Sequence, residues 1–270
     1  MRRIADWLER YSLLPTVLLC LAAVIFVLLL LDLVEPAQAQ SRFFNGASGG
    51  GDKIVLGNPS VLNNISPMTI CAWVNPGGFG GTSPRIYDKS DADGTNGGPL
   101  VFLGGTNQAQ MEAGYRNTVS DVSAVGTVTN SAWNYLCYTW AGGGAVFWHM
   151  FIGNRSTAMA EVSYASTANE TPPDDSSIAA TIGNRKTTAN RTFDGNIAHL
   201  AIWGCALNAT QQDQFRIRSY APRTSISGCA LKGYWPLWGS DATSALDHSG
   251  NGSNGTVTGT TVGVGGPFGR

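Results

Sequence analysis

The chain has 270 residues, of which 13% are charged, 10% are aromatic and 34 are glycine. This aromatic content is too high for a disordered chain, and the 14 basic and 14 acidic side chains after residue 41 leave no basic excess for a nucleic-acid partner. The 3 histidines are scattered along the sequence, which argues against a multi-histidine metal centre. The composition favours many short strands joined by glycine-rich turns.

The first patterned segment is an uncharged run of 19 residues, Leu13–Leu31. As a helix rising about 1.5 Å per residue, it would just span a hydrocarbon core of roughly 30 Å. Arginines in the preceding segment, 1–12, favour a cytoplasmic N-terminus and export of the rest of the chain. The run also suits the core of a signal peptide, because Ala37-Gln38-Ala39 in segment 32–41 resembles a cleavage site. A retained single-helix membrane anchor and a secreted protein cleaved after Ala39 both place residues 42–270 outside the cytoplasm.

Beyond residue 41, short stretches with the alternating pattern of strands are separated by turn residues. We predict strands, in chain order, at Lys53–Leu56, Met68–Val74, Pro99–Leu103, Asn134–Trp140, Ala145–Ile152, Ala158–Tyr164, Ile178–Ile182, Gly195–Trp203, Ala230–Pro236 and Gly255–Val262. A short helix at about Ala209–Arg216 is indicated by Asn208 and Gln211, which have the spacing of a capping box. Because no Pro-rich or charged linker interrupts residues 42–270, the pattern predicts one all-β domain, a sandwich or a barrel.

Four cysteines lie in the predicted exported part, at Cys71, Cys137, Cys205 and Cys229, whereas Cys20 lies in the apolar run. An even number of cysteines in an oxidising compartment favours two disulfides. Four cysteines allow three connectivities, and their spacing does not choose among them. Four buried free thiols are the alternative.

The carboxylates do not have the pattern of a glycosidase. A retaining glycosidase needs two carboxylates about 5 Å apart, one as nucleophile and one as acid. The glutamates after residue 41 are Glu112, Glu161 and Glu170, and none begins an E-x-D-x-x-E run of the glucanase type. The adjacent pair Asp174-Asp175 would point to opposite faces of a strand, which favours a solvated turn. We therefore expect a protein that is not an enzyme.

Several stretches resemble the successive motifs of one known kind of domain and follow the same order along the chain. They are Phe44-Asn45-Gly46 with Lys53–Leu56, then Met68–Val74, Trp133–Trp140, Thr192–Trp203 and Ala206-Leu207-Asn208. This series resembles the motifs of laminin-G-like domains, which belong to the concanavalin A-like lectin/glucanase superfamily. The resemblance covers residues 42–270 and implies a jelly-roll sandwich of two antiparallel sheets.

The order of one further motif is unusual. Gly233–Leu237 with Asp247–Gly252 resembles an element that opens the domain in many relatives, whereas here it closes the chain. The resemblance therefore implies a circular permutation, which is tolerated where chain ends lie close together. Tyr234–Leu237 should then lie near Phe43-Phe44-Asn45.

The disulfide pairing rests on a related resemblance. Cys71 and Cys137 resemble the cysteine pair of the pentraxins, which share the fold and link neighbouring strands in this way. That resemblance implies a Cys71–Cys137 disulfide and leaves Cys205 to pair with Cys229.

The resemblance also implies a function, a non-catalytic extracytoplasmic recognition module that binds a glycan or a surface protein. One alternative is a structural surface or virion decoration protein without a small ligand. Another is a glycan-active hydrolase or lyase, against which the missing carboxylate pair counts. Aromatic residues that flank turns are the candidate sugar platforms, with packing within the protein as the alternative: Tyr87, Tyr115, Trp133, Trp148 and Trp238.

Calcium is the cofactor that the resemblance suggests, because many relatives carry Ca²⁺ on a rim of loops. Arg185 and Lys186 stand where pentraxins have carboxylates, so we expect the pentraxin double-calcium site to be absent. Asp91, Asp93 and Asn96 lie in an acidic loop and carry the oxygen ligands that calcium prefers. A solvated turn, in which Asp, Gly and Asn are common, is the alternative.

Overall fold

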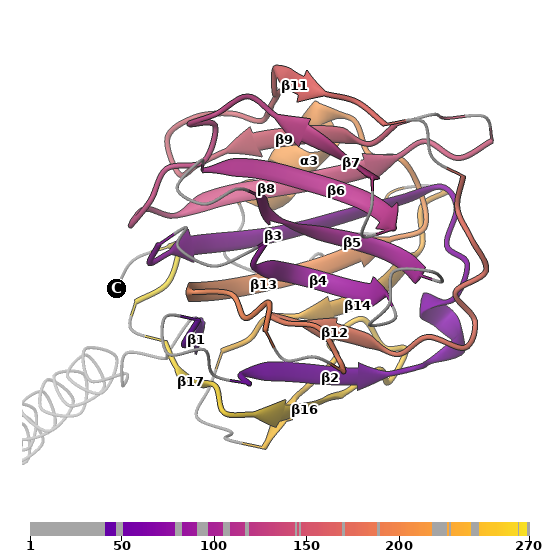
Figure 1. Ribbon diagram of the computed structural model, residues 1–270, viewed down its shortest axis with the longest axis vertical. Coiled ribbons are helices and arrows are strands. Elements are labelled where there is room, and N and C mark those ends of the chain that lie inside the picture. Colours follow the sequence, from indigo (N-terminus) through magenta and orange to yellow (C-terminus); the bar gives the residue numbers. More distant parts are fainter. Residues whose placement is uncertain are drawn as a thin grey trace, which may run out of the picture. The chain divides into compact units, whose positions relative to one another are not determined.

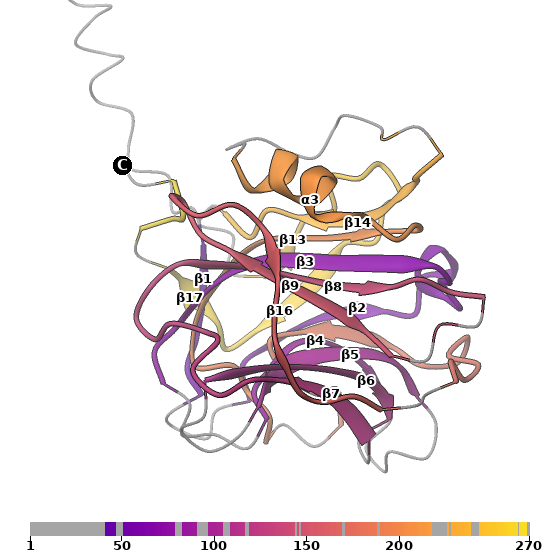
Figure 2. The ribbon, with the colours of Figure 1, turned by 90° about the horizontal axis from the view of Figure 1, so that it is seen from above.

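The regular structure of the described residues is almost entirely β-strand, in two antiparallel sheets that pack face to face, as Figures 1 and 2 show. The computed structural model describes residues 41–46, 51–78, 83–90, 97–104, 109–116, 119–143, 145, 147–168, 171–187, 190–217, 226, 228–238, 243–263 and 265–268. These belong to a compact unit, Ala39–Arg270, which contains both disulfides and both hydrophobic clusters. The predicted all-β, jelly-roll-like sandwich is confirmed.

The first sheet has eight strands. They are β1 (Arg42–Phe44), β3 (Met68–Pro76), β8 (Asn134–Trp140), β9 (His149–Gly153), β10 (Ala160–Glu161), β13 (Gly195–Trp203), β14 (Leu231–Trp235) and β17 (Thr261–Val262). Their order across the sheet is β10-β9-β8-β3-β13-β1-β17, and β14 also pairs with β13.

The second sheet has nine strands. They are β2 (Lys53–Gly57), β4 (Arg85–Ser90), β5 (Gly97–Gly104), β6 (Gln110–Arg116), β7 (Val119–Ser123), β11 (Tyr164–Ser166), β12 (Ala180–Ile182), β15 (Ser244–Ala245) and β16 (Gly255–Thr258). Their order is β11-β7-β6-β5-β4-β12-β2-β16-β15. A 3-10 helix, η1 (Ser60–Leu62), comes after β2, and an α-helix, α3 (Ala209–Arg216), comes after β13.

The central strands of the first sheet are buried on both faces, which explains their continuous apolar sequences. On β3, Ile70, Ala72 and Val74 belong to the cluster between the sheets. Cys71 and Trp73 point the other way, into a second cluster on the outer face of the sheet. This alternation is the period of two residues that a strand imposes. Both sides of β3 are thus apolar, as the sequence indicates.

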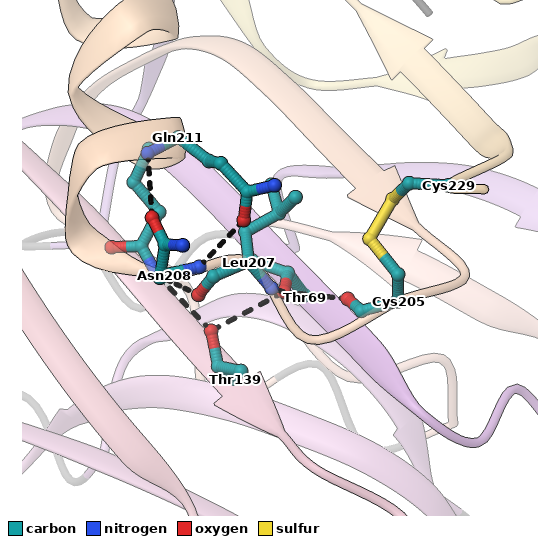
Figure 3. The surroundings of a disulfide bond; sticks show 8 residues. Thr69, Thr139, Cys205, Leu207, Asn208, Gln211 and Cys229 are labelled. Atoms are coloured by element: carbon teal, nitrogen blue, oxygen red, sulfur yellow. Dashed lines mark hydrogen bonds between the residues drawn. A yellow bond between two sulfur atoms is a disulfide. The ribbon is translucent and has the colours of Figure 1, made fainter. Parts of the chain in front are cut away.

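The chain after β13 covers the outer cluster, and in Figure 2 α3 lies on that outer side of the sheet. The helix begins at the predicted capping box, in which Gln211 N donates to Asn208 Oδ1 and Asn208 N donates to Gln211 Oε1. A disulfide between Cys205 and Cys229 fixes the same connection, close to Thr69 of β3 (Figure 3). The predicted helix bounds are confirmed.

The other disulfide joins Cys71 of β3 to Cys137 of β8, residues that are directly opposite in the strand register. Their Cα atoms are 4.2 Å apart, and both side chains are fully buried. Both pairings that the pentraxin resemblance implied are therefore confirmed.

The predicted closeness of the two ends of the domain is also confirmed. β13 pairs with β3 along one edge, and its other edge is shared by β1 and β14. Phe44 of β1 lies opposite Gly195, and Trp235 of β14 lies opposite Leu200 farther along the same strand. Both side chains belong to the cluster between the sheets.

Several strand predictions need correction. The strand expected from Ala145 begins only at His149, because the preceding amide, Trp148 N, donates to Asp121 Oδ2 instead of to a neighbouring strand. The stretch 158–164 divides between β10 and β11, and 255–262 divides into β16 and β17 around Gly259, which has a positive φ of 75°. The sequence analysis did not predict β4, β6 and β7, whose outer faces carry polar residues.

No helix within the described part of the chain is long and apolar enough to cross a membrane. The run Leu13–Leu31, on which the anchor and signal-peptide hypotheses depend, lies outside that part.

Candidate functional site

The predictions that Tyr87 and Trp148 are sugar platforms are wrong. The side chain of Tyr87 is 1% exposed and that of Trp148 is fully buried, and both belong to the cluster between the sheets. A sugar cannot stack on either ring without opening this core. Both residues flank turns in the sequence, but Tyr87 lies within β4 and Trp148 directly precedes β9, and both side chains point into the core.

Two other predicted platforms, Trp238 and Trp133, keep part of their side-chain surface exposed to solvent. Trp238, three residues after the end of β14, is 36% exposed, and the rings of His199 and His248 contact it edge to face. Trp133, just before β8, is half-buried against the outer cluster. Trp238 therefore keeps a surface that a ligand can contact.

The predicted calcium ligands Asp91, Asp93 and Asn96 lie outside the described residues. Among the residues that are described, no three His, Cys, Asp or Glu side chains lie close enough together to hold a metal ion.

A pocket of about 330 Å³ opens at the end of the sandwich where η1 leads into β3. Three segments distant in the sequence form it: the turn after η1, the end of β6, and the chain that precedes β12. Its lining residues are Asn64, Ile65, Ser66, Tyr115, Pro172, Pro173, Asp174 and Asp175. The volume is at the lower end of the range of roughly 300–1,000 Å³ for small-molecule sites.

The inner wall of the pocket is aromatic. Tyr115, the fifth predicted platform, is 2% exposed, and its ring packs edge to face on Trp140 with centroids 4.9 Å apart. Trp148 lies 5.1 Å from the same ring, so three aromatic side chains support each other behind the pocket. The sequence analysis thus named a lining residue, although the ring forms a wall and not an exposed platform.

Asp174 gives the rim a carboxylate that is held in place. Its Oδ1 atom accepts hydrogen bonds from Ser176 N at 3.0 Å and from Asn64 Nδ2 at 2.9 Å. Neither of these two bonds uses Oδ2. The hydrogen bonds from Ser176 and Asn64 lower the pKa of Asp174 to about 2, so this exposed side chain is charged at neutral and mildly acidic pH.

Hydrogen bonds and an ion pair of Asp175 and Lys89 stabilise the wall of the pocket behind Asp174. Asn64 N donates to Asp175 Oδ1 at 2.7 Å, and Asp175 N donates to Asn64 Oδ1 at 2.9 Å. The fully buried Lys89 Nζ lies 2.6–3.0 Å from four oxygens: Asp175 Oδ1 and O, Leu62 O and Asn63 Oδ1. Burial lowers the pKa of Lys89, and the hydrogen bond and charge of Asp175 oppose this shift. One ammonium group therefore joins η1, β4 and the segment before β12.

A close approach of the Asp175 side chain to the backbone of Gly98 completes this wall. The carboxylate of Asp175 lies so near Gly98 at the start of β5 that a Cβ atom at Gly98 would collide with Asp175 Oδ2. The sequence analysis missed Asn64 and Lys89 and assigned Asp174-Asp175 to a solvated turn. Two adjacent aspartates after two prolines were the visible signal, but the lysine that neutralises one of them is 86 positions away.

Comparison with known proteins identifies the family. The laminin-G-type model of the Concanavalin A-like lectin/glucanases superfamily matches residues 48–211. No curated protein sequence matches the chain at a significant level. Among solved structures, a proposed carbohydrate-binding protein from Bacteroides ovatus ATCC 8483 is 17% identical with a TM-score of 0.54, over 82% of this chain and 58% of that one.

Two smaller structures are also similar. The heptameric SAP-like pentraxin of Limulus polyphemus is 13% identical with a TM-score of 0.45, over 68% of this chain and 84% of that one. The CBM40 of Ruminococcus gnavus IT-sialidase is 11% identical with a TM-score of 0.44, over 57% of this chain and 84% of that one. At these identities the structural similarity concerns the fold alone.

Proposed function

The chain belongs to the concanavalin A-like lectin/glucanase superfamily, and we propose that its sandwich is a non-catalytic carbohydrate-binding module. The ligand site in this proposal is the pocket beside Tyr115. The single observation that supports it most strongly is the combination of apolar wall and fixed carboxylate in one cavity of about 330 Å³.

Sugar binding requires the two kinds of surface that this pocket combines. The carbon-bound hydrogens of a sugar ring pack on flat apolar groups. Pro172 and Pro173 supply such groups in front of a wall formed by Ile65 and the buried ring of Tyr115. Sugar hydroxyls donate hydrogen bonds, and a carboxylate is a strong acceptor. The side chain of Asp174 does not have to be ordered when a ligand binds, because hydrogen bonds from Asn64 and Ser176 already hold its carboxylate. The small volume suits a terminal sugar unit better than a long chain.

The proposal excludes hydrolysis at this pocket on electrostatic grounds. A glycosidase keeps one carboxyl protonated, with a raised pKa, to protonate the leaving group. The pKa of Asp174 is lowered, and Asp175 is paired with Lys89. Burial raises the pKa of Glu112 and Asp121, but neither is among the residues that line the pocket. These features support binding without catalysis.

An extracytoplasmic location is the second part of the proposal. Two disulfides suit an oxidising compartment, and the arginine-flanked run Leu13–Leu31 suits export of the residues after it. The run would hold the module on a membrane or be removed after Ala39. The fold of the Bacteroides ovatus protein, which is itself described in terms of carbohydrate binding, is consistent with a glycan as the partner.

The test is a glycan array probed with the unit Ala39–Arg270 carrying both disulfides, followed by calorimetric titration of the strongest hit. Asp174→Ala should lower the affinity severalfold, because it removes the charged hydrogen-bond acceptor of the rim. Glu161→Ala is the matched control, because it removes an exposed carboxylate on β10, in the other sheet.

Two results would contradict the proposal. Saturable binding that is lost in Trp238→Ala and unchanged in Asp174→Ala would move the ligand to the exposed tryptophan. If no glycan binds, the module is better explained as a structural or adhesive surface protein, the alternative that the sequence left open.

A further inference from the structure

The charges around the pocket restrict the sugars that it can accept. Its described lining residues include Asp174 and Asp175, and no lysine, arginine or histidine is among those described. The nearby cation, Lys89, is fully buried and is already surrounded by four oxygens, one of them from the carboxylate of Asp175. Of the two described carboxylates in the lining, that of Asp175 is thus paired with Lys89, and that of Asp174 faces the ligand, with Lys89 acting on it only from a distance.

On the basis of the proposed function, we propose that this pocket selects sugars without acid groups and prefers amino sugars with a protonated amine. Uronic acids, sialic acids and sulfated sugars are excluded from it. Asp174 can only accept hydrogen bonds when it is ionised, so the ligand group facing it must donate. A hydroxyl meets this requirement, and an ammonium group meets it with an added attraction between charges.

Because Asp174 stays ionised, the exclusion of acidic sugars should not change between mildly acidic and neutral pH. Its hydrogen bonds to Ser176 and Asn64 fix the carboxylate at the rim and keep it ionised. An acidic sugar at the same place would bring a second negative charge within several ångströms, where like charges repel appreciably even near water. Protonating either group to relieve the repulsion is unfavourable at neutral pH. The rim thus acts as a fixed negative charge.

Salt should weaken this selection, because the rim is exposed. Asp174 lies at the surface, and charges there are screened over a Debye length of about 10 Å at 0.1 M salt. Hydrogen bonds and ring packing depend much less on ionic strength. A preference for amine sugars that is caused by charge should therefore decrease as salt is added, whereas a preference caused by shape should not.

The experiment uses a glycan array with matched sets that share one backbone: a neutral oligosaccharide, its deacetylated amine form, and its carboxylated or sulfated form. We expect binding of neutral and amine forms, with the acidic form at least tenfold weaker at low salt. Titrations of the best matched set with wild type, Asp174→Asn and Glu161→Gln then test whether the carboxylate of Asp174 causes the preference. Asp174→Asn should remove the amine-over-neutral preference, a change of about two- to fivefold for an exposed charge pair, and Glu161→Gln should leave it unchanged.

The outcomes distinguish a failure of this charge selection from a failure of the proposed carbohydrate binding. Acidic forms that bind as tightly as their neutral partners would overturn it, while carbohydrate binding would stand. The same holds if Asp174→Asn weakens neutral and amine forms equally, because the side chain would then act through shape and hydrogen bonding. Binding of no glycan would overturn the proposed function itself.

Discussion

Acidification should destabilise the domain through His199, which lies at a bulge within β13. The residue is 8% exposed, its Nδ1 atom lies 2.7 Å from Tyr234 Oη, and the rings of Trp238 and Phe268 contact it edge to face. Because burial disfavours the charged imidazolium, the pKa of His199 falls from 6.5 to about 4. The imidazole is therefore neutral in the folded protein at physiological pH.

These two values give the direction of the pH effect. The unfolded chain binds a proton at this histidine below about pH 6.5, and the folded chain only below about pH 4. The free energy of unfolding should therefore decrease as the pH falls through this window and be unaffected above it. At about 1.36 kcal/mol per pKa unit, the loss reaches about 3 kcal/mol.

Guanidinium unfolding at several pH values between about 7 and 4, monitored by tryptophan fluorescence, measures this loss. His199→Asn removes the titration and suits the backbone, because φ is +50° at this residue and asparagine tolerates that region. The variant should lose about 3 kcal/mol less than wild type on acidification. If His199→Asn loses as much stability as wild type, the reasoning is wrong.

Two further predictions concern the covered face of the first sheet. Replacing Cys71 and Cys137 by alanine should lower the free energy of unfolding by about 4 kcal/mol, and replacing Cys205 and Cys229 by about 3 kcal/mol, because the closed loops span 66 and 24 positions. Guanidinium midpoints check this order, and a reversed order contradicts it. Thr69→Val should cost about 1–3 kcal/mol, because Thr69 Oγ1 donates to Cys205 O and accepts from Leu207 N (Figure 3). Thr256→Val, at an exposed position of β16, is the control and should change the midpoint little.

The strands that the sequence predicted best are those buried on both faces. β3, β8 and β13 have nearly uninterrupted apolar sequences because one side meets the second sheet and the other meets the covering segment with α3. β4 is also buried at every position, but its buried residues include Arg85, Asp88 and Lys89. Glu112 and Asp121 interrupt the apolar pattern of β6 and β7 in the same way. β4 also has two register shifts against β5, so its side chains do not follow a simple period of two.

The candidate site was harder to predict because its chemistry depends on contacts between distant residues. Asn64 and Asp174 are 110 positions apart, and each is an ordinary turn residue in the sequence. The role of Asp175 changes from solvated to structural only because Lys89 lies beside it in space. Tyr115 was predicted from its place near a turn, and that reasoning failed for Tyr87 and Trp148. Sequence shows where aromatic residues flank turns but not which of them the packing leaves beside a cavity.

Lys89 leads to a last prediction, on the role of cations in this pocket. The ammonium group neutralises Asp175, which is 2% exposed, and holds oxygens from three segments. Lys89→Met should therefore cost about 3–5 kcal/mol, because it leaves a buried carboxylate unpaired. The double variant Lys89→Met/Asp175→Asn should recover part of that loss in guanidinium unfolding. Equal losses in the single and double variants would show that Asp175 is not the group that Lys89 neutralises.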